Sequence, residues 1–176
     1  MKAIKLVLFY LLQWTWALSQ NIVGGIGCLL LALSGKHRRK NYHGAVITYV
    51  NTPKSFGGVS IGMFIFVNGK YIRANPEDGW THDTRVHEFG HCVQSLLLGP
   101  LYWIVVALPS VVWCNLPYFA KMHDTKATKH VYYKLYCEGW ANVWGAAWTG
   151  EDFVTAEMIR GGRYGKAWVK KQGRLR

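Results

Sequence analysis

Two histidines and a glutamate stand at a spacing that suits metal chemistry. The segment Thr84–His91 contains the motif HExxH, formed by His87, Glu88 and His91. On an α-helix, residues four apart lie on one face, so both imidazoles can reach one ion. Zinc lowers the pKa of a bound water toward about 7, and the neighbouring glutamate can accept the proton of that water. The motif therefore predicts zinc-dependent hydrolysis with Glu88 as the general base.

A catalytic zinc site needs a third protein ligand and keeps one position open for water. We expect Glu138 to be this ligand, because it lies in an apolar segment where an unpaired carboxylate would be strongly disfavoured. The downstream alternatives are His123, Asp124 and His130. Asn142 lies four residues after Glu138, so it shares a helix face with the carboxylate and can orient one of the imidazoles.

The two motifs together resemble those of gluzincin peptidases, in which HExxH is followed by Glu-x-x-Ala-Asp. The chain is most similar to the integral-membrane family that includes the HtpX heat-shock proteases and the CAAX prenyl endopeptidases. The resemblance covers residues 83–142 and implies the zinc ligands and the general base named above. It also implies that Asn142, which stands where the family has Asp, supports a ligand. His-Glu-x-Gly-His is similar to site-2 intramembrane proteases too, but the chain has no Leu-Asp-Gly motif.

Two further groups are candidates for contacts with a substrate. His130, Tyr133 and Tyr136 precede the expected third ligand, and each is a candidate donor to the oxyanion of a tetrahedral intermediate. Packing within a helix bundle is the alternative for these side chains. The predicted strand Val59–Val67 is a candidate for pairing with an extended substrate above the metal, and a structural hairpin is its alternative.

Long apolar segments must position these residues. Residues 6–34 carry no charge, and at about 1.5 Å per residue a helix of that length exceeds the hydrocarbon core of about 30 Å. We interpret them as a membrane helix, with a cleaved signal peptide over residues 1–19 as the alternative. The HExxH helix, predicted over 83–97, continues into a proline-interrupted membrane segment at 98–120. Residues 129–149 form the third apolar helix, which carries Glu138.

β-Forming residues fill the region between the first apolar segment and the motif. Ala45–Val50 is typical of one strand and Val59–Val67 of another, and Asn68-Gly69 is a strong hairpin pattern leading into Lys70–Ile72. Residues 43–73 therefore predict a small antiparallel sheet, arranged as a β-meander. The expected fold is a single α+β membrane domain with about three membrane helices and this sheet before a zincin-like HExxH helix.

The net charge of +12 at pH 7 could indicate a nucleic-acid partner. The cations instead gather beside apolar segments, at Lys36–Lys40 and in a basic tail over 151–176. Such clusters are typical of membrane topology determinants that contact anionic lipid headgroups. No nucleic-acid motif accompanies them, so we expect a lipid bilayer and no nucleic acid as partner. We predict an integral protein of a bacterial inner membrane, with its C-terminus in the cytoplasm.

These observations predict a zinc-dependent endopeptidase that cleaves a peptide or membrane-protein substrate at or within the membrane. A zinc-stabilised binding or adaptor protein without catalysis is the alternative, and such a protein would not need Glu88. The four cysteines have no paired spacing, which favours buried free thiols over disulfides. The sequence leaves the oligomeric state open.

Overall fold

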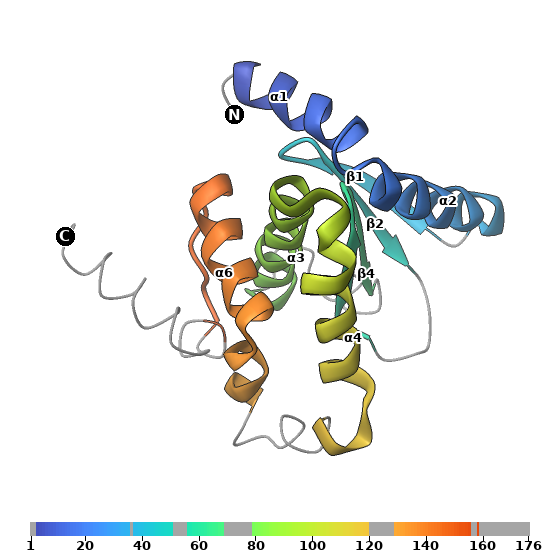
Figure 1. Ribbon diagram of the computed structural model, residues 1–176. Helices are drawn as coiled ribbons and strands as arrows, with labels where there is room; N and C mark the ends of the chain where they lie inside the picture. Colours follow the sequence, from blue (N-terminus) through green and yellow to red (C-terminus); the bar gives the residue numbers. More distant parts are fainter. Residues whose placement is uncertain are drawn as a thin grey trace.

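A computed structural model describes residues 3–35, 37–50, 56–68, 79–119, 129–155 and 158 (Figure 1). The α-helices are α1 (Ala3–Trp14), α2 (Leu18–Ser34), α3 (Gly79–Leu98), α4 (Leu108–Asn115) and α6 (Tyr136–Thr149). Two short 3-10 helices, η2 (Gly99–Leu101) and η4 (Lys129–Lys134), and one π-helical turn, η3 (Trp103–Ala107), lie between them. The strands are β1 (His37–Tyr42), β2 (Ala45–Val50), β3 (Gly58–Ile61) and β4 (Phe64–Asn68). The predicted mixture of helices with a small sheet is confirmed.

The four strands lie in the order β1-β2-β4-β3. β1 pairs antiparallel with β2 and β3 with β4, but β2 pairs parallel with β4. The prediction of a wholly antiparallel sheet is therefore wrong. The error arises because the segment predicted as one strand, Val59–Val67, is two strands joined by a turn at Gly62. The φ angle of Gly62 is +63°, a conformation that favours a residue without a Cβ. That turn places β3 at the edge and β4 beside β2. The predicted return from Asn68-Gly69 into Lys70–Ile72 lies outside the described residues.

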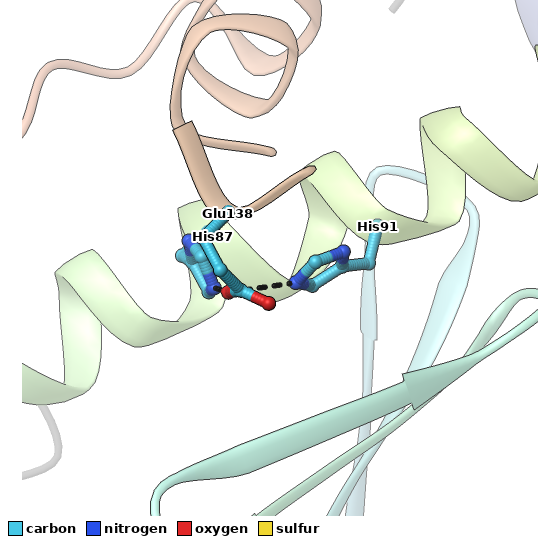
Figure 2. Close-up of side chains that lie close together, drawn as sticks. All are labelled: His87, His91 and Glu138. Atoms are coloured by element: carbon cyan, nitrogen blue, oxygen red, sulfur yellow. Dashed lines mark ion pairs between the residues drawn. The ribbon is translucent and has the colours of Figure 1, made fainter. Parts of the chain in front are cut away.

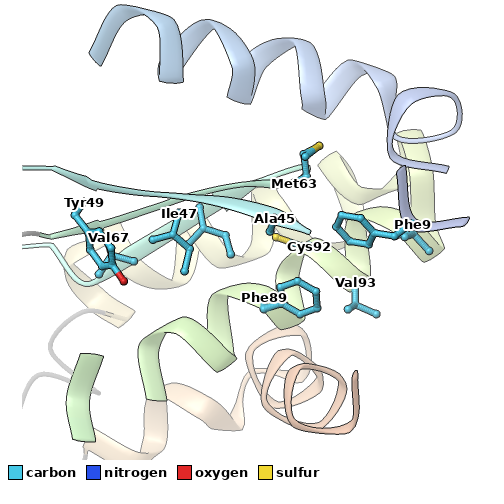
Figure 3. Close-up of a cluster of buried hydrophobic side chains, with 11 residues drawn as sticks. Phe9, Ala45, Ile47, Tyr49, Met63, Val67, Phe89, Cys92 and Val93 are labelled. Carbon is cyan, nitrogen blue, oxygen red and sulfur yellow. The ribbon is translucent and has the colours of Figure 1, made fainter. Parts of the chain in front are cut away.

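One face of the sheet forms the core with α3 (Figure 3). Ile47, Ile65 and Val67 are fully or almost fully buried against Phe89 and Cys92 of α3. Burial of apolar side chains of this size contributes about 1.5–3 kcal/mol each. The contact fixes α3, and with it the HExxH motif, on the sheet.

The opposite face of the sheet is covered by α2. Gly24, Gly25 and Gly27 of this helix lie against the rings of Phe64 and Phe66. A Cβ at Gly24 would overlap the backbone of β3, so the close approach of helix and sheet requires glycine at that position. The sheet is therefore enclosed between α2 and α3.

The predicted membrane helix over 6–34 is two helices rather than one. α1 and α2 meet at an angle of 89°. Buried amides hold the bend together: Asn21 Nδ2 donates to Gln13 Oε1 at 2.8 Å, and Gln13 Nε2 donates to the carbonyl oxygen of Cys92 at 3.1 Å. Among the described residues no single helix is both long enough and apolar enough to cross a membrane, and α1 with α2 meets those criteria only as a bent pair.

The two later apolar segments are also broken into shorter pieces. Residues 99–115 pass through η2 and η3 before α4, and prolines stand at the starts of η2 and α4, where a missing N–H is tolerated. The segment predicted as a third helix, 129–149, begins as η4 and becomes α-helical at Tyr136. The HExxH helix begins at Gly79, four residues earlier than predicted.

α3 and α6 cross very closely. A Cβ at Gly90 of α3 would overlap the backbone of Ala141, and a Cβ at Gly145 of α6 would overlap the backbone carbonyl of Val86. Small residues on both helices therefore let the two backbones touch. This crossing brings the first turn of α6, with Glu138, onto the histidines of α3.

Candidate metal centre

His87, His91 and Glu138 meet in one buried group (Figure 2). Glu138 Oε2 lies 3.1 Å from His87 Nε2 and 3.4 Å from His91 Nε2. The three ligand atoms all lie within 4.8 Å of one another, and Glu138 is fully buried. Two histidines from one face of α3 and a carboxylate from α6 thus form a group that could hold a metal ion.

Each imidazole is oriented by a buried amide. His87 Nδ1 lies 2.7 Å from Asn142 Oδ1, and His91 Nδ1 lies 2.6 Å from Gln94 Oε1. An amide oxygen can only accept a hydrogen bond, so both histidines must carry their proton on Nδ1. Both Nε2 atoms then present lone pairs toward Glu138, which is the arrangement that metal-binding histidines use.

When both imidazoles are neutral, the centre therefore collects three electron-pair donors with no hydrogen between them. Glu138 Oε2 is buried and has no hydrogen-bond partner among the described residues. Such a group needs a cation at its middle, either a proton or a metal ion. Burial lowers the pKa of His91, but the negative charge of Glu138 beside the ring outweighs burial and raises the pKa to about 9. The donor set of two imidazoles and a carboxylate fits zinc.

Glu88 lies beside the centre, between α3 and the edge strand β3. Its carboxylate is buried, and Ser60 Oγ lies 2.6 Å from Glu88 Oε2 and 2.9 Å from the Glu88 backbone oxygen. The hydroxyl has one proton and donates to one of these oxygens at a time. A Cβ at Gly58 would overlap the Glu88 carboxylate, so β3 passes directly over it. The role of Ser60 could not be read from sequence spacing, because it comes from another element.

The predicted oxyanion donors are placed differently from one another. The ring of Tyr133 lies edge-on to His87, with centroids 5.4 Å apart, so this residue is at the centre. The hydroxyl of Tyr136 donates to the backbone oxygen of Val105, and its side chain is exposed. The prediction of Tyr136 as an oxyanion donor is therefore not supported by its position. His130 lies in η4, and its side chain is outside the described residues, as are His123 and Asp124.

Two polar residues that no motif distinguished connect α3 and α6. Gln94 Nε2 donates to the carbonyl oxygen of Cys137 at 2.6 Å, so Gln94 links His91 to the residue before Glu138. Asp83 accepts hydrogen bonds from the backbone N–H groups of Val154 and Thr155 at 2.9 and 2.8 Å. Through these two bonds, Asp83 ties the first turns of α3 to the chain that follows α6.

Comparisons with protein-family models, with curated proteins and with solved structures found no match for this chain.

Proposed function

We propose that this chain is a zinc-dependent endopeptidase that acts at a membrane. The observation that carries the proposal is the buried group of His87, His91 and Glu138, with an acidic side chain, Glu88, beside it. A purely structural zinc site is closed by four protein ligands, whereas three leave room for water and substrate. A bound Zn²⁺ supplies a Lewis acid that polarises a carbonyl and lowers the pKa of a water.

The residues around the group divide the chemistry. His87, His91 and Glu138 hold the ion, and Glu88 accepts a proton from the attacking water and passes it to the leaving amine. Ser60 holds the Glu88 carboxylate in place through its hydroxyl. Tyr133, which lies against His87, is the candidate donor to the oxyanion that the described residues place at the centre.

The substrate would lie along β3. This strand is at the edge of the sheet, and it crosses the Glu88 carboxylate at Gly58. An extended peptide that adds to such an edge is held by backbone hydrogen bonds, which suits a peptide substrate. One backbone group on the free edge of β3 is already occupied, because the Tyr102 hydroxyl donates to the Ser60 carbonyl oxygen at 3.1 Å. We expect pairing to centre on Gly58.

The bent pair of α1 and α2, whose outer faces are apolar, supports a membrane setting. The basic residues of β1 suit contact with anionic headgroups. We expect substrates that are themselves at the membrane, and the bacterial inner membrane remains our proposed location.

The test combines metal content with turnover. Purified wild-type protein should bind about one zinc per chain, and His91→Ala and Glu138→Ala should lose it, since two ligands bind zinc weakly. Glu88→Gln should keep the zinc and lose peptide hydrolysis by about 10²–10⁴-fold. Full function in Glu88→Gln would instead favour the non-catalytic zinc-stabilised adaptor. A wild-type protein without zinc after zinc is supplied would contradict both functions.

A further inference from the structure

α2 buries its two amide side chains and exposes most of its large apolar residues. The side chains that α2 buries against the protein are Gln20, Asn21 and Cys28. Its opposite face consists of exposed large apolar residues: Ile22, Val23, Ile26, Leu29, Leu30 and Leu33. The most exposed of these side chains, Leu33, is 78% exposed. This is the reverse of a helix on a water-soluble domain, and an apolar face of this length indicates an apolar neighbour.

α1 and the segment after α3 also expose large apolar residues. α1 exposes Ile4, Val7, Leu8 and Leu11 while it buries Phe9 and Gln13. The segment from η2 to α4 exposes Leu101, Ile104, Leu108 and Val111. This segment contacts the start of α2 through two hydrogen bonds. Trp103 Nε1 donates to Ser19 Oγ at 3.1 Å, and Gln20 Nε2 donates to the carbonyl oxygen of Gly99. We call the exposed apolar residues of α1 and α2 the apolar surface.

The lengths and angle of the helices decide how this surface can meet a bilayer. α1 has 12 residues and α2 has 17, so they are about 18 and 26 Å long, each shorter than the hydrocarbon core of about 30 Å. Because they meet at 89°, only one could follow the bilayer normal. Neither helix alone therefore provides a crossing.

Arg39 provides a second argument. Its guanidinium donates to the carbonyl oxygen of Cys28, about two thirds of the way along α2, at 2.6 Å. If α2 crossed the bilayer, this cation would be carried into hydrocarbon, which is strongly disfavoured. If α2 lies parallel to the membrane, the whole helix stays at the membrane surface. Arg39 is then at the same depth as the helix and can reach anionic headgroups.

We infer that α1 and α2 lie in the plane of the membrane, inserted into one anionic leaflet by the apolar surface, with Arg39 at the headgroups. The inference rests on the membrane association proposed above but not on hydrolysis. It replaces three membrane crossings with a monotopic anchor, so that both ends of the α1–α2 pair lie on the same side of the bilayer.

The position of the two ends tests this directly. Ala3→Cys and Ser34→Cys would be introduced one at a time into a Cys114→Ser background, since the other three native cysteines are buried. A membrane-impermeant maleimide would be applied to intact spheroplasts and to inverted vesicles of expressing bacteria. We expect both cysteines to react in the same preparation. Reaction of one in spheroplasts and of the other in inverted vesicles would show a crossing and overturn the inference.

Vesicle binding tests the surface and the lipid. The purified protein should bind phosphatidylcholine vesicles more tightly when they contain phosphatidylglycerol. Arg39→Gln should weaken that binding about fivefold while Arg39→Lys preserves it. Ile26→Asp should weaken it at least about tenfold, and Val154→Asp, an exposed position outside the apolar surface, should not.

The outcomes separate this inference from the proposed function. Equal binding by Ile26→Asp and the wild type, or no effect of phosphatidylglycerol, would overturn in-plane anchoring. Zinc content, measured on the same samples, does not depend on vesicles. Loss of vesicle binding with zinc retained would therefore leave the metal centre intact and remove the membrane from the proposal.

Discussion

Neutral amides rather than carboxylates support both histidines of the metal centre. Asn142 reaches from α6 to His87, and Gln94 reaches from its bond with His91 to the backbone of α6. Each helix thus contributes one side chain that holds the other helix at the centre. A neutral acceptor fixes the ring without making the imidazole as basic as a carboxylate would.

Gln94→Leu should weaken zinc binding about 10–100-fold, because His91 loses its orienting acceptor and α6 loses a contact beside Glu138. Zinc affinity would be measured by competition with a chromogenic chelator. Gln94→Glu keeps the acceptor for His91 and serves as the matched control, with binding closer to that of the wild type. Unchanged affinity in Gln94→Leu would contradict a positioning role.

Asn142→Asp should bind zinc more tightly than the wild type, because an anionic partner makes the His87 imidazole a stronger donor to the ion. Asn142→Leu should bind it about 10–100-fold more weakly. The same chelator competition orders the three proteins. An order in which Asp binds more weakly than Leu would contradict the hydrogen bond from His87 Nδ1 to residue 142.

The spacing of residues on one helix was sufficient to predict His87, His91 and the relation of Asn142 to Glu138. Helix geometry fixes these relations locally. Ser60 and the backbone partner of Gln94 could not be predicted this way, since both contacts join elements that are distant in the chain. Tyr136 shows the same limit of sequence spacing: Glu138, two residues on, lies at the centre, whereas the Tyr136 side chain is exposed and its hydroxyl donates to the Val105 backbone oxygen.

At the scale of elements, the crossing of α3 and α6 sets the geometry of the centre. Gly90→Ala should destabilise the protein by about 1–3 kcal/mol and lower its zinc content, because the added methyl would push the Ala141 backbone away. Urea unfolding and elemental analysis would measure both effects. Gly57→Ala is the matched control, because a Cβ there meets no atom within 4 Å. Equal loss in both variants would point to a general glycine effect rather than to the crossing.

The sequence predicted the β-forming regions of the sheet but not their pairing. β-Propensity and alternation mark a strand, whereas the break at Gly62 inside an otherwise continuous apolar run decides which strands become neighbours. β1 was missed because its sequence, HRRKNY, lacks β-branched and aromatic residues until its last position. Charged residues suit this strand because it lies at the edge of the sheet.

At the scale of the whole molecule, one carboxylate links three separate parts of the chain. Glu151 follows α6, and its two oxygens lie 2.8 Å from His43 Nε2, in the turn between β1 and β2, and 3.1 Å from His82 Nε2, in the first turn of α3. Burial raises the pKa of Glu151, but the hydrogen bond from His43 and the charges of both histidines outweigh it and lower the pKa.

This lowered pKa predicts a dependence of stability on pH. The contribution of Glu151 to the free energy of unfolding is complete above its ordinary pKa of 4.5 and is lost as the pH falls through the lower, folded-state value. The urea midpoint of the wild type should therefore fall more steeply below about pH 4.5 than that of Glu151→Gln. If the urea midpoints of the two proteins fell in parallel with pH, the stabilising contacts of Glu151 with His43 and His82 would be contradicted.

The uncharged run over residues 6–34 is compatible with a straight helix or with a bent pair, because composition reports hydrophobicity and not direction. The bend depends on Gln13 and Asn21, which bond to each other and to distant backbone. These polar side chains face other parts of the protein at the point where the helix turns.

The joining of α3 and α6 also has a consequence for the order in which the protein matures. During synthesis His87 and His91 leave the ribosome well before Glu138, and two imidazoles alone retain zinc poorly. If the centre binds zinc as proposed, tight capture of the ion would have to wait until α6 has docked through Gly90 and Gly145. A chain that holds zinc would then be one in which α6 is already in place.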